Sequence, residues 1–213
     1  MDRKSAFVVV VHGNLTSAHF PQAENTCIKL TCTYGREWKL ISGQTQHISA
    51  YCTPGSTSII AVDLPFEACF GSNDPYQWPR YVLTCYTRNR NGHDRINGYG
   101  ALFLPTTPGQ YKLKVRCYMP EPSSLIQSLI SMFRGLSAEL VNPLMPAYAD
   151  GRYGLRVSTK GTVEIELNIQ TRVSDTSFNF KNMKKVDFTP PSRSQPPPLA
   201  SNNEDIRSDP EET

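Results

Sequence analysis

The sequence predicts a mostly β protein, an antiparallel β-sandwich of seven or eight strands with one inserted amphipathic helix. Apolar and polar residues alternate with a period of two in several segments, and Gly, Pro and Asn separate these segments at short intervals. Such alternation is typical of strands with one buried and one solvent-facing side. Many short strands between turn residues favour two packed β layers.

Three segments show the alternation most clearly, at residues 28–34, 111–117 and 162–170. Residues 8–11 are four consecutive valines, which are apolar on both faces and therefore suit a central strand. Further strands are expected at residues 6–12, 57–64, 80–87 and 99–104.

The helix is expected as an insertion at residues 123–136. Ser124 can cap its first turn, Gln127 completes a capping box, and Gly135 is a typical stop. The apolar residues then fall on one stripe, formed by Leu125, Ile126, Leu129, Ile130 and Phe133. This stripe either packs on the domain's own strands or docks in part on a partner protein.

Charge and composition divide the chain into three parts, a folded domain at 6–172, a C-terminal extension at 173–186 and a tail at 187–213. The tail holds six prolines, six acidic residues and two arginines, and we expect it to be disordered because it cannot bury enough apolar surface. The chain before it carries a net charge of +7. That charge favours an acidic partner or an anionic membrane surface, or it reflects an ordinary solvated surface.

The cellular compartment is expected to be reducing. The apolar run at residues 6–11 is too short for the core of a secretory signal, and no run is long enough to span a bilayer. The six cysteines are therefore expected to be free thiols.

Few residues suggest chemistry. The sequence contains no CxxC, HExxH, GxSxG or phosphate-loop motif, and its four histidines are dispersed. Cys27 and Cys32 fall on opposite faces of one strand, and no loop holds two of the aspartates that a calcium site would need. We therefore expect no cofactor, no metal site, no nucleic-acid partner and no enzyme activity. A zinc site or active site assembled from distant residues is the alternative.

One strand face is basic. Lys112, Lys114 and Arg116 alternate with apolar residues and so share a side of their strand. They could meet the headgroups of an anionic membrane. Alternatively, they pair across strands with acids such as Glu164 and Glu166, or stay solvated.

Six segments form a recognisable series by their order and spacing. They are GNLTSAHFP (13–21), YGREWKLISG (34–43), NDPYQWP (73–79), GYG (98–100), PTTPG (105–109) and GTVEIELNI (161–169). Taken together, they resemble the B-nine domain family. The resemblance covers about residues 7–172. Its order and spacing are most similar to the first of the family's three branches, although WKLISG and WPR resemble the second.

The resemblance implies a fold and a role. Family members are ciliary proteins whose domain is a calcium-lacking variant of the C-two sandwich. It implies a non-enzymatic structural subunit on the cytoplasmic side of the ciliary base, in the Meckel-syndrome and tectonic-like complex of the transition zone and basal body. That complex supports the ciliary membrane diffusion barrier and ciliogenesis. The implied partners are the second and the Meckel-syndrome-type branches, contacted through sandwich edges and loops. The alternative role is a calcium-independent peripheral lipid-binding module.

The residues that carry the family signature are Pro75, Tyr76, Trp78, Pro79, Gly98, Tyr99 and Gly100. The two prolines fix φ and remove two backbone donors, so we expect a stiff corner. The two glycines indicate unusual backbone dihedrals or a close approach of another segment. The aromatic residues either pack in the core or form a rim that touches a partner.

Overall fold

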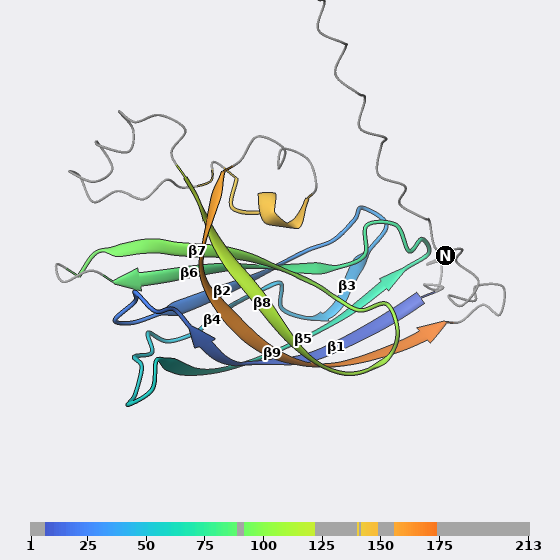
Figure 1. The fold of residues 1–213 in the computed structure, drawn as a ribbon. Helices are drawn as coiled ribbons and strands as arrows, with labels where there is room; N and C mark the ends of the chain where they lie inside the picture. Colours follow the sequence, from blue (N-terminus) through green and yellow to red (C-terminus); the bar gives the residue numbers. More distant parts are fainter. Residues whose placement is uncertain (1–6, 89–91, 122–139, 141, 149–155, 174–213) are drawn as a thin grey trace, which may run out of the picture. The chain divides into compact units, whose positions relative to one another are not determined.

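The computed structural model of this 213-residue chain describes residues 7–88, 92–121, 140, 142–148 and 156–173 (Figure 1). The predicted helix at 123–136, the extension beyond residue 173 and the predicted tail lie outside the described residues. The chain divides into two units, Met1–Phe178 and Asn179–Thr213, and only the first contains described residues.

The described part is built from strands that all pair in antiparallel fashion. Their order in the sheet is β3-β5-β1-β9-β8-β7-β6-β2-β4. The nine strands are β1 (Phe7–His19), β2 (Cys27–Thr33), β3 (Lys39–Gly43), β4 (Gln46–Ile48), β5 (Ile59–Ser72), β6 (Arg80–Arg88), β7 (Asp94–Phe103), β8 (Gly109–Pro120) and β9 (Val157–Val173). One short 3-10 turn, η1 (Met145–Ala147), is the helical element of the described residues.

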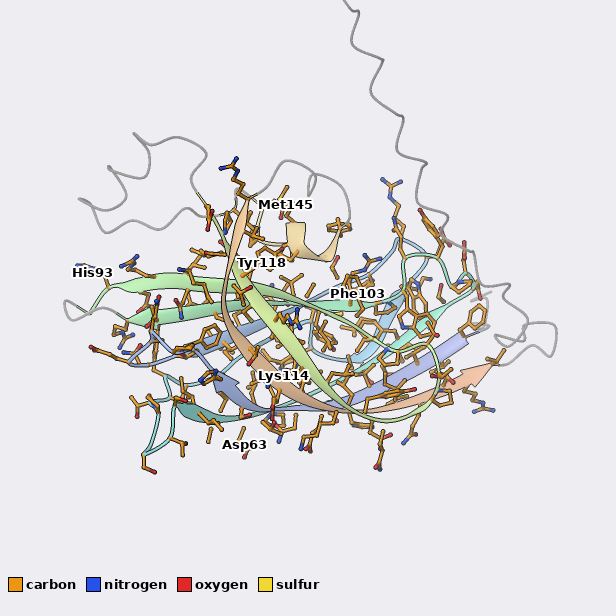
Figure 2. All side chains as sticks on the ribbon, in the orientation of Figure 1. Asp63, His93, Phe103, Lys114, Tyr118 and Met145 are labelled. Carbon is orange, nitrogen blue, oxygen red and sulfur yellow. The ribbon has the colours of Figure 1, made fainter. Side chains whose placement is uncertain are left out.

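The sheet consists of two halves that face each other. Strands β7 and β8 share a single backbone pair, Tyr99 with Tyr118, and this pair is the joint between the halves. The ring of Phe66 on β5 lies 5.0 Å from the ring of Tyr81 on β6, so the apolar side chains of one half pack directly against those of the other. In Figure 1, β8 and β9 run diagonally across the direction of β6 and β7, and Figure 2 shows the side chains between them.

The mostly β, antiparallel prediction is confirmed, and all seven segments predicted as strands are strands. The strand count was wrong, because β3 and β4 were missed. These two strands are short and almost wholly exposed, so they show no apolar alternation. The predicted C-terminal boundaries of β1 and β5 were also wrong. Strand β1 continues past residue 12 to His19, and β5 continues past residue 64 through Pro65 to Ser72.

The cysteine prediction is confirmed, because all six thiols are free. Cys85 on β6 and Cys117 on β8 are both fully buried, and their Sγ atoms lie 3.8 Å apart between the two halves. The hydrogen-bond contact with Cys117, followed by burial, raises the pKa of Cys85 well above its usual value, which keeps this thiol protonated. Among the described residues, no helix is long and apolar enough to cross a membrane.

Glycines allow the two halves to meet closely at the joint. A Cβ atom at Gly100 on β7 would lie 3.0 Å from Cγ1 of Val115 and 3.2 Å from Sγ of Cys117, both on β8. At Gly98 the nearest atom, Cβ of Cys117, would be 3.3 Å away. The close approach expected from the sequence is therefore present at both glycines.

We predict that Gly100→Val lowers the free energy of unfolding by about 1–3 kcal/mol, because the added methyl groups overpack the joint between β7 and β8. Urea denaturation followed by tryptophan fluorescence measures the loss. The control is Gly55→Val, since a Cβ atom at Gly55 would have no neighbour within 4 Å. Equal stability of the two variants would contradict this account of the joint.

Candidate interaction surfaces

The signature segment 73–79 forms a tight corner between β5 and β6. The backbone N–H of Tyr76 donates to Oδ1 of Asp74 at 2.9 Å, which closes an Asx turn around Pro75. The Ser72 hydroxyl accepts from the Asp74 N–H at 3.1 Å and donates to the carbonyl of Glu37 at 3.0 Å. These bonds tie the corner both to itself and to the connection between β2 and β3.

Two tryptophans fasten the corner to that same connection. The Trp38 indole N–H donates to the carbonyl of Tyr76 at 2.9 Å, and the Trp38 and Trp78 rings meet edge to face with centroids 4.9 Å apart. The backbone N–H of Gly35 donates to the carbonyl of Gln77 at 3.0 Å. Gln77 itself has φ of 53°, the left-handed conformation that lets the chain turn back toward β6.

Most of the signature is internal. Pro79, Gly98, Tyr99 and Gly100 are buried, and Pro75 and Trp78 are partly buried. Tyr99 is fully buried, and its hydroxyl accepts a bond from the backbone N–H of Leu140 at 3.2 Å. Tyr76, at 72% exposure, is the signature side chain that is open to solvent. Tyr99 and, in part, Trp78 therefore pack inside the fold, whereas Tyr76 does not.

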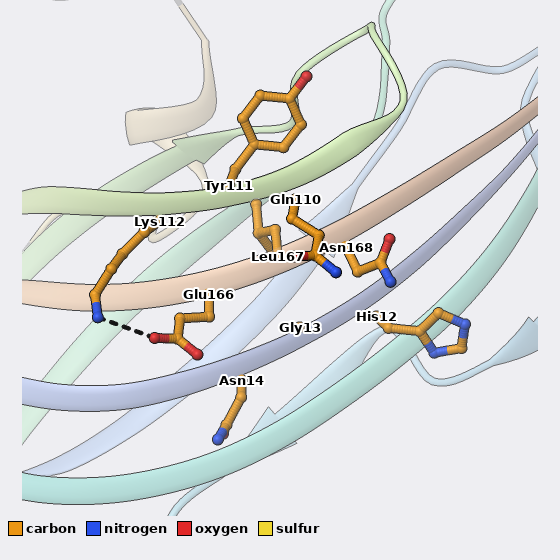
Figure 3. A pocket seen from close by; sticks show the side chains of 9 residues that line it. All are labelled: His12, Gly13, Asn14, Gln110, Tyr111, Lys112, Glu166, Leu167 and Asn168. Atoms are coloured by element: carbon orange, nitrogen blue, oxygen red, sulfur yellow. Dashed lines mark ion pairs between the residues drawn. The ribbon is translucent and has the colours of Figure 1, made fainter.

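The predicted basic face lies on β8, and an open groove of about 640 Å³ begins there and crosses β9 to β1. Its lining residues, shown in Figure 3, are His12, Gly13, Asn14, Gln110, Tyr111, Lys112, Glu166, Leu167 and Asn168. Lys112 forms an ion pair with Glu166 at 3.0 Å, and Lys114 pairs with Glu164 at 3.5 Å. The cross-strand pairing that was the alternative for these lysines is thus present.

Further acids reduce the positive charge of this face. His12 lies 3.6 Å from Glu67 on β5, and Asn14 donates to Asp63 at 2.6 Å. Arg116 lies opposite Thr162 in the β8–β9 ladder, so its strand neighbour is neutral. Paired charges and amides make the face polar and mixed in sign, which does not suit it to attract anionic headgroups strongly.

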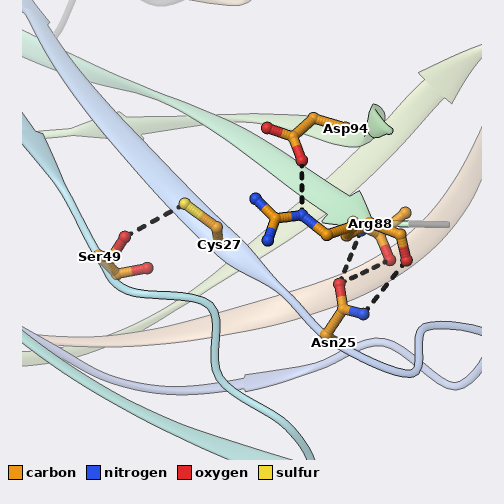
Figure 4. A network of polar contacts seen from close by, with 6 residues as sticks. Asn25, Cys27, Ser49, Arg88 and Asp94 are labelled. Carbon is orange, nitrogen blue, oxygen red and sulfur yellow. Dashed lines mark hydrogen bonds and ion pairs between the residues drawn. The ribbon is translucent and has the colours of Figure 1, made fainter. Parts of the chain in front are cut away.

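A second polar cluster holds the far end of the β6–β7 hairpin (Figure 4). The Arg88 guanidinium contacts Asp94 at 3.0 Å, as Figure 4 shows. It also covers the ring of Tyr51, whose centroid is 4.3 Å away. Asn25 accepts from the Arg88 backbone N–H at 2.7 Å and donates to its carbonyl at 3.2 Å. Hydrogen bonds, first from Tyr51 and then from Arg88, lower the pKa of Asp94. The pKa of Tyr51 is raised to about 12, first by burial and then by its hydrogen bond to the Asp94 carboxylate. Sequence reasoning missed this cluster because its members come from three separate connections.

The His, Cys, Asp and Glu side chains of the described residues are dispersed. Within the described residues, no group of three or more His, Cys, Asp or Glu side chains could hold a metal ion. Cys32 lies in the main apolar core, while Cys27 donates its thiol to the carbonyl of Ser49 at 3.2 Å outside it. The two cysteines are therefore directed to opposite sides of β2, as their spacing predicted.

The chain is similar to a known protein family over most of its length. The model of the B9-C2 family, described as ciliary basal body-associated B9 proteins, matches residues 9–170. The chain belongs to this family. The match spans the sheet from β1 into β9 and includes every segment on which the resemblance was based.

Named relatives agree with the assignment. B9 domain-containing protein 1 of Xenopus laevis is 32% identical over 86% of this chain and 89% of its own, and the Homo sapiens protein 1 is 31% identical over 90% and 91%. B9 domain-containing protein 2 of Drosophila melanogaster is 27% identical over 80% of this chain and 96% of its own. The first-branch resemblance is therefore confirmed. A C2 domain of plant Extended Synaptotagmin 1 is similar at a TM-score of 0.40, with 13% identity over 81% of this chain and 99% of that domain.

We predict that Trp78→Ala lowers the free energy of unfolding by about 2–4 kcal/mol, because it removes the edge-to-face contact with Trp38 and leaves a void beside the core. Tyr76→Ala is the matched control. It keeps the carbonyl that binds Trp38 and removes an exposed ring, so we expect a change within about 0.5 kcal/mol. Chemical denaturation of both variants tests this difference, and a Tyr76→Ala loss as large as that of Trp78→Ala would refute it.

The Asp94 pair predicts a pH dependence. Because the folded-state pKa of Asp94 is below its usual value of 3.8, the pair contributes stability above that value. The contribution is lost as the pH falls through the folded-state pKa. Asp94→Asn should therefore be less stable than wild type at pH 7, and the difference should shrink with acidification. A constant difference from pH 7 to pH 3, measured by urea unfolding, would count against the pair.

Proposed function

We propose that this chain is a non-enzymatic structural subunit of a complex at the ciliary base, on the cytoplasmic side of the transition zone. In this role it binds the other B9 proteins, of the second and the Meckel-syndrome-type branches, and supports the ciliary membrane diffusion barrier and ciliogenesis. The observation that carries the proposal is the family match over residues 9–170, which takes in the two-layered core and the signature corner.

The structure supports a role in binding rather than in chemistry. The family signature is used for internal packing, at the corner and at the joint between β7 and β8. The open groove is lined by amides and by charges that are already paired, among them Lys112 with Glu166. Such a polar lining resembles the rim of a protein interface rather than its apolar centre.

A lipid-binding role has less support. Its main evidence was the row Lys112, Lys114 and Arg116, and two of these three cations lie in ion pairs with acids of β9. A membrane surface would have to compete with those carboxylates, which repel anionic headgroups. We therefore favour the assembly role.

We predict that the full chain, co-expressed with a second-branch and a Meckel-syndrome-type B9 protein, purifies with them as one complex at fixed stoichiometry. Affinity capture through a tag on this chain, followed by size-exclusion chromatography, measures the association. An unrelated β-sandwich domain with the same tag serves as the control for non-specific capture. Separate elution of all three B9 proteins at micromolar concentration would refute the proposed function.

A further inference from the structure

The outer face of the β2–β6–β7 layer carries a fixed row of side chains outside the groove. Thr33, Arg80 and Phe103 are direct neighbours on β2, β6 and β7, because Thr33 pairs with Arg80 and Arg80 pairs with Phe103. Tyr81 and Leu102, the next residues along β6 and β7, belong to the apolar core. Side chains alternate along a strand, so the row Thr33–Arg80–Phe103 is directed away from the core.

The segment that follows η1 completes this row. The Tyr148 hydroxyl lies 2.7 Å from the Thr33 hydroxyl, and the Arg80 guanidinium lies 5.7 Å from the ring centroids of both Phe103 and Tyr148. Arg80 also donates to the carbonyl of Ala147, and to that of Trp78 at 3.5 Å. The guanidinium therefore contacts both rings and two backbone carbonyls. Figure 2 labels Phe103 on β7 and Met145, the first residue of η1, so the reader can locate these contacts there.

We call Thr33, Arg80, Phe103 and Tyr148 the aromatic–arginine row. Its rings remain open to solvent, with exposures of 54% for Phe103 and 39% for Tyr148. Among the described residues, the contacts of the Arg80 cation are carbonyl oxygens and ring faces, and no carboxylate pairs with it. A half-buried positive charge thus lies beside two rings that are open to solvent.

This combination has the composition of a binding hot spot. Aromatic residues and arginine are enriched where protein interfaces hold most of their free energy, and little entropy is lost when the side chains are already fixed. A planar guanidinium binds a carboxylate through two parallel hydrogen bonds. Charge complementarity therefore selects a partner surface with an acidic side chain next to an apolar one.

The edges of the sheet at β3 and β5 suit association less well. The outer edge of β5 beyond β3 contains Asp63, with φ of 47°, and Pro65, which has no N–H to donate. Strand β3 has a bulge at Ile41, where its register with β5 shifts. Bulges, prolines and charges are features that block strand addition. Association through a sheet face is therefore better supported than association through these edges.

We propose that the aromatic–arginine row is the surface through which this chain docks on another B9-family protein, and that the partner presents a carboxylate flanked by an apolar side chain. The inference rests on the proposed function for the identity of the partner. Phe103 and Tyr148 would insert against the apolar side chain, and Arg80 would bind the carboxylate.

The test uses the full chain and both candidate B9 partners, with affinity measured by biolayer interferometry. Phe103→Glu should weaken binding to one partner at least about thirty-fold, because it removes a ring and repels the carboxylate. Phe103→Ser is the second variant, and it should weaken binding about tenfold. The control is Ile59→Glu, which changes a side chain of equal exposure, 54%, on β5, and it should bind within about threefold of wild type.

The possible outcomes separate this inference from the proposed function. If wild type binds the partners and both folded Phe103 variants bind equally well, the row is not the interface, and the assembly role stands. If wild type binds neither partner, both proposals fall. Tighter binding by Phe103→Glu would mean that a segment of this chain covers the row. Loss of wild-type self-association in that variant would assign the row to a second copy. Either result would overturn the inference.

Discussion

The joint between β7 and β8 is the constraint on which the rest of the structure depends. These strands share only the pair of Tyr99 with Tyr118, so each can follow its own half of the sheet. Glycines on β7 let side chains of β8 approach its backbone, and Cys117 fills the space against Cys85 from β6. The two halves are thereby brought face to face around one apolar core. Both outer faces, with the groove on one and the aromatic–arginine row on the other, exist because the sheet bends at this point.

The outer face of β8 and β9 shows how strand register limits function. Antiparallel pairing places Lys112 opposite Glu166 and Lys114 opposite Glu164, at a distance where opposite charges attract. Each exposed pair is worth only about 0–1 kcal/mol of stability. Its greater consequence is electrostatic, since it cancels the field that three cations on one strand would otherwise produce. A row of lysines in a sequence therefore indicates a basic surface only if the facing strand lacks acids.

Sequence patterns predicted this fold well where a strand has a buried face. The alternation in 28–34, 111–117 and 162–170 located β2, β8 and β9, because the core dictates every second residue there. Strands β3 and β4 have almost no buried side and so leave no such pattern. In the structure, residues 73–79 connect β5 to β6, and the backbone at Gly98 and Gly100 lies close to side chains of β8. The Arg88–Asp94 cluster and the aromatic–arginine row were not identified, because each joins residues that are distant in sequence and only strand register brings them together.

The signature corner and the aromatic–arginine row are physically continuous, which links the family's structural motif to its surface. Pro79 ends the corner and Arg80 follows it at the start of β6. The position of Arg80 therefore depends on the same contacts that fix Trp78 against Trp38, and the Trp78 carbonyl accepts a bond from its guanidinium. A looser corner would shift Arg80 relative to Phe103 and Tyr148 and would let all three side chains sample other rotamers. The internal packing of the signature would thus act on binding indirectly, by keeping a half-buried arginine and two exposed rings in one arrangement before a partner arrives.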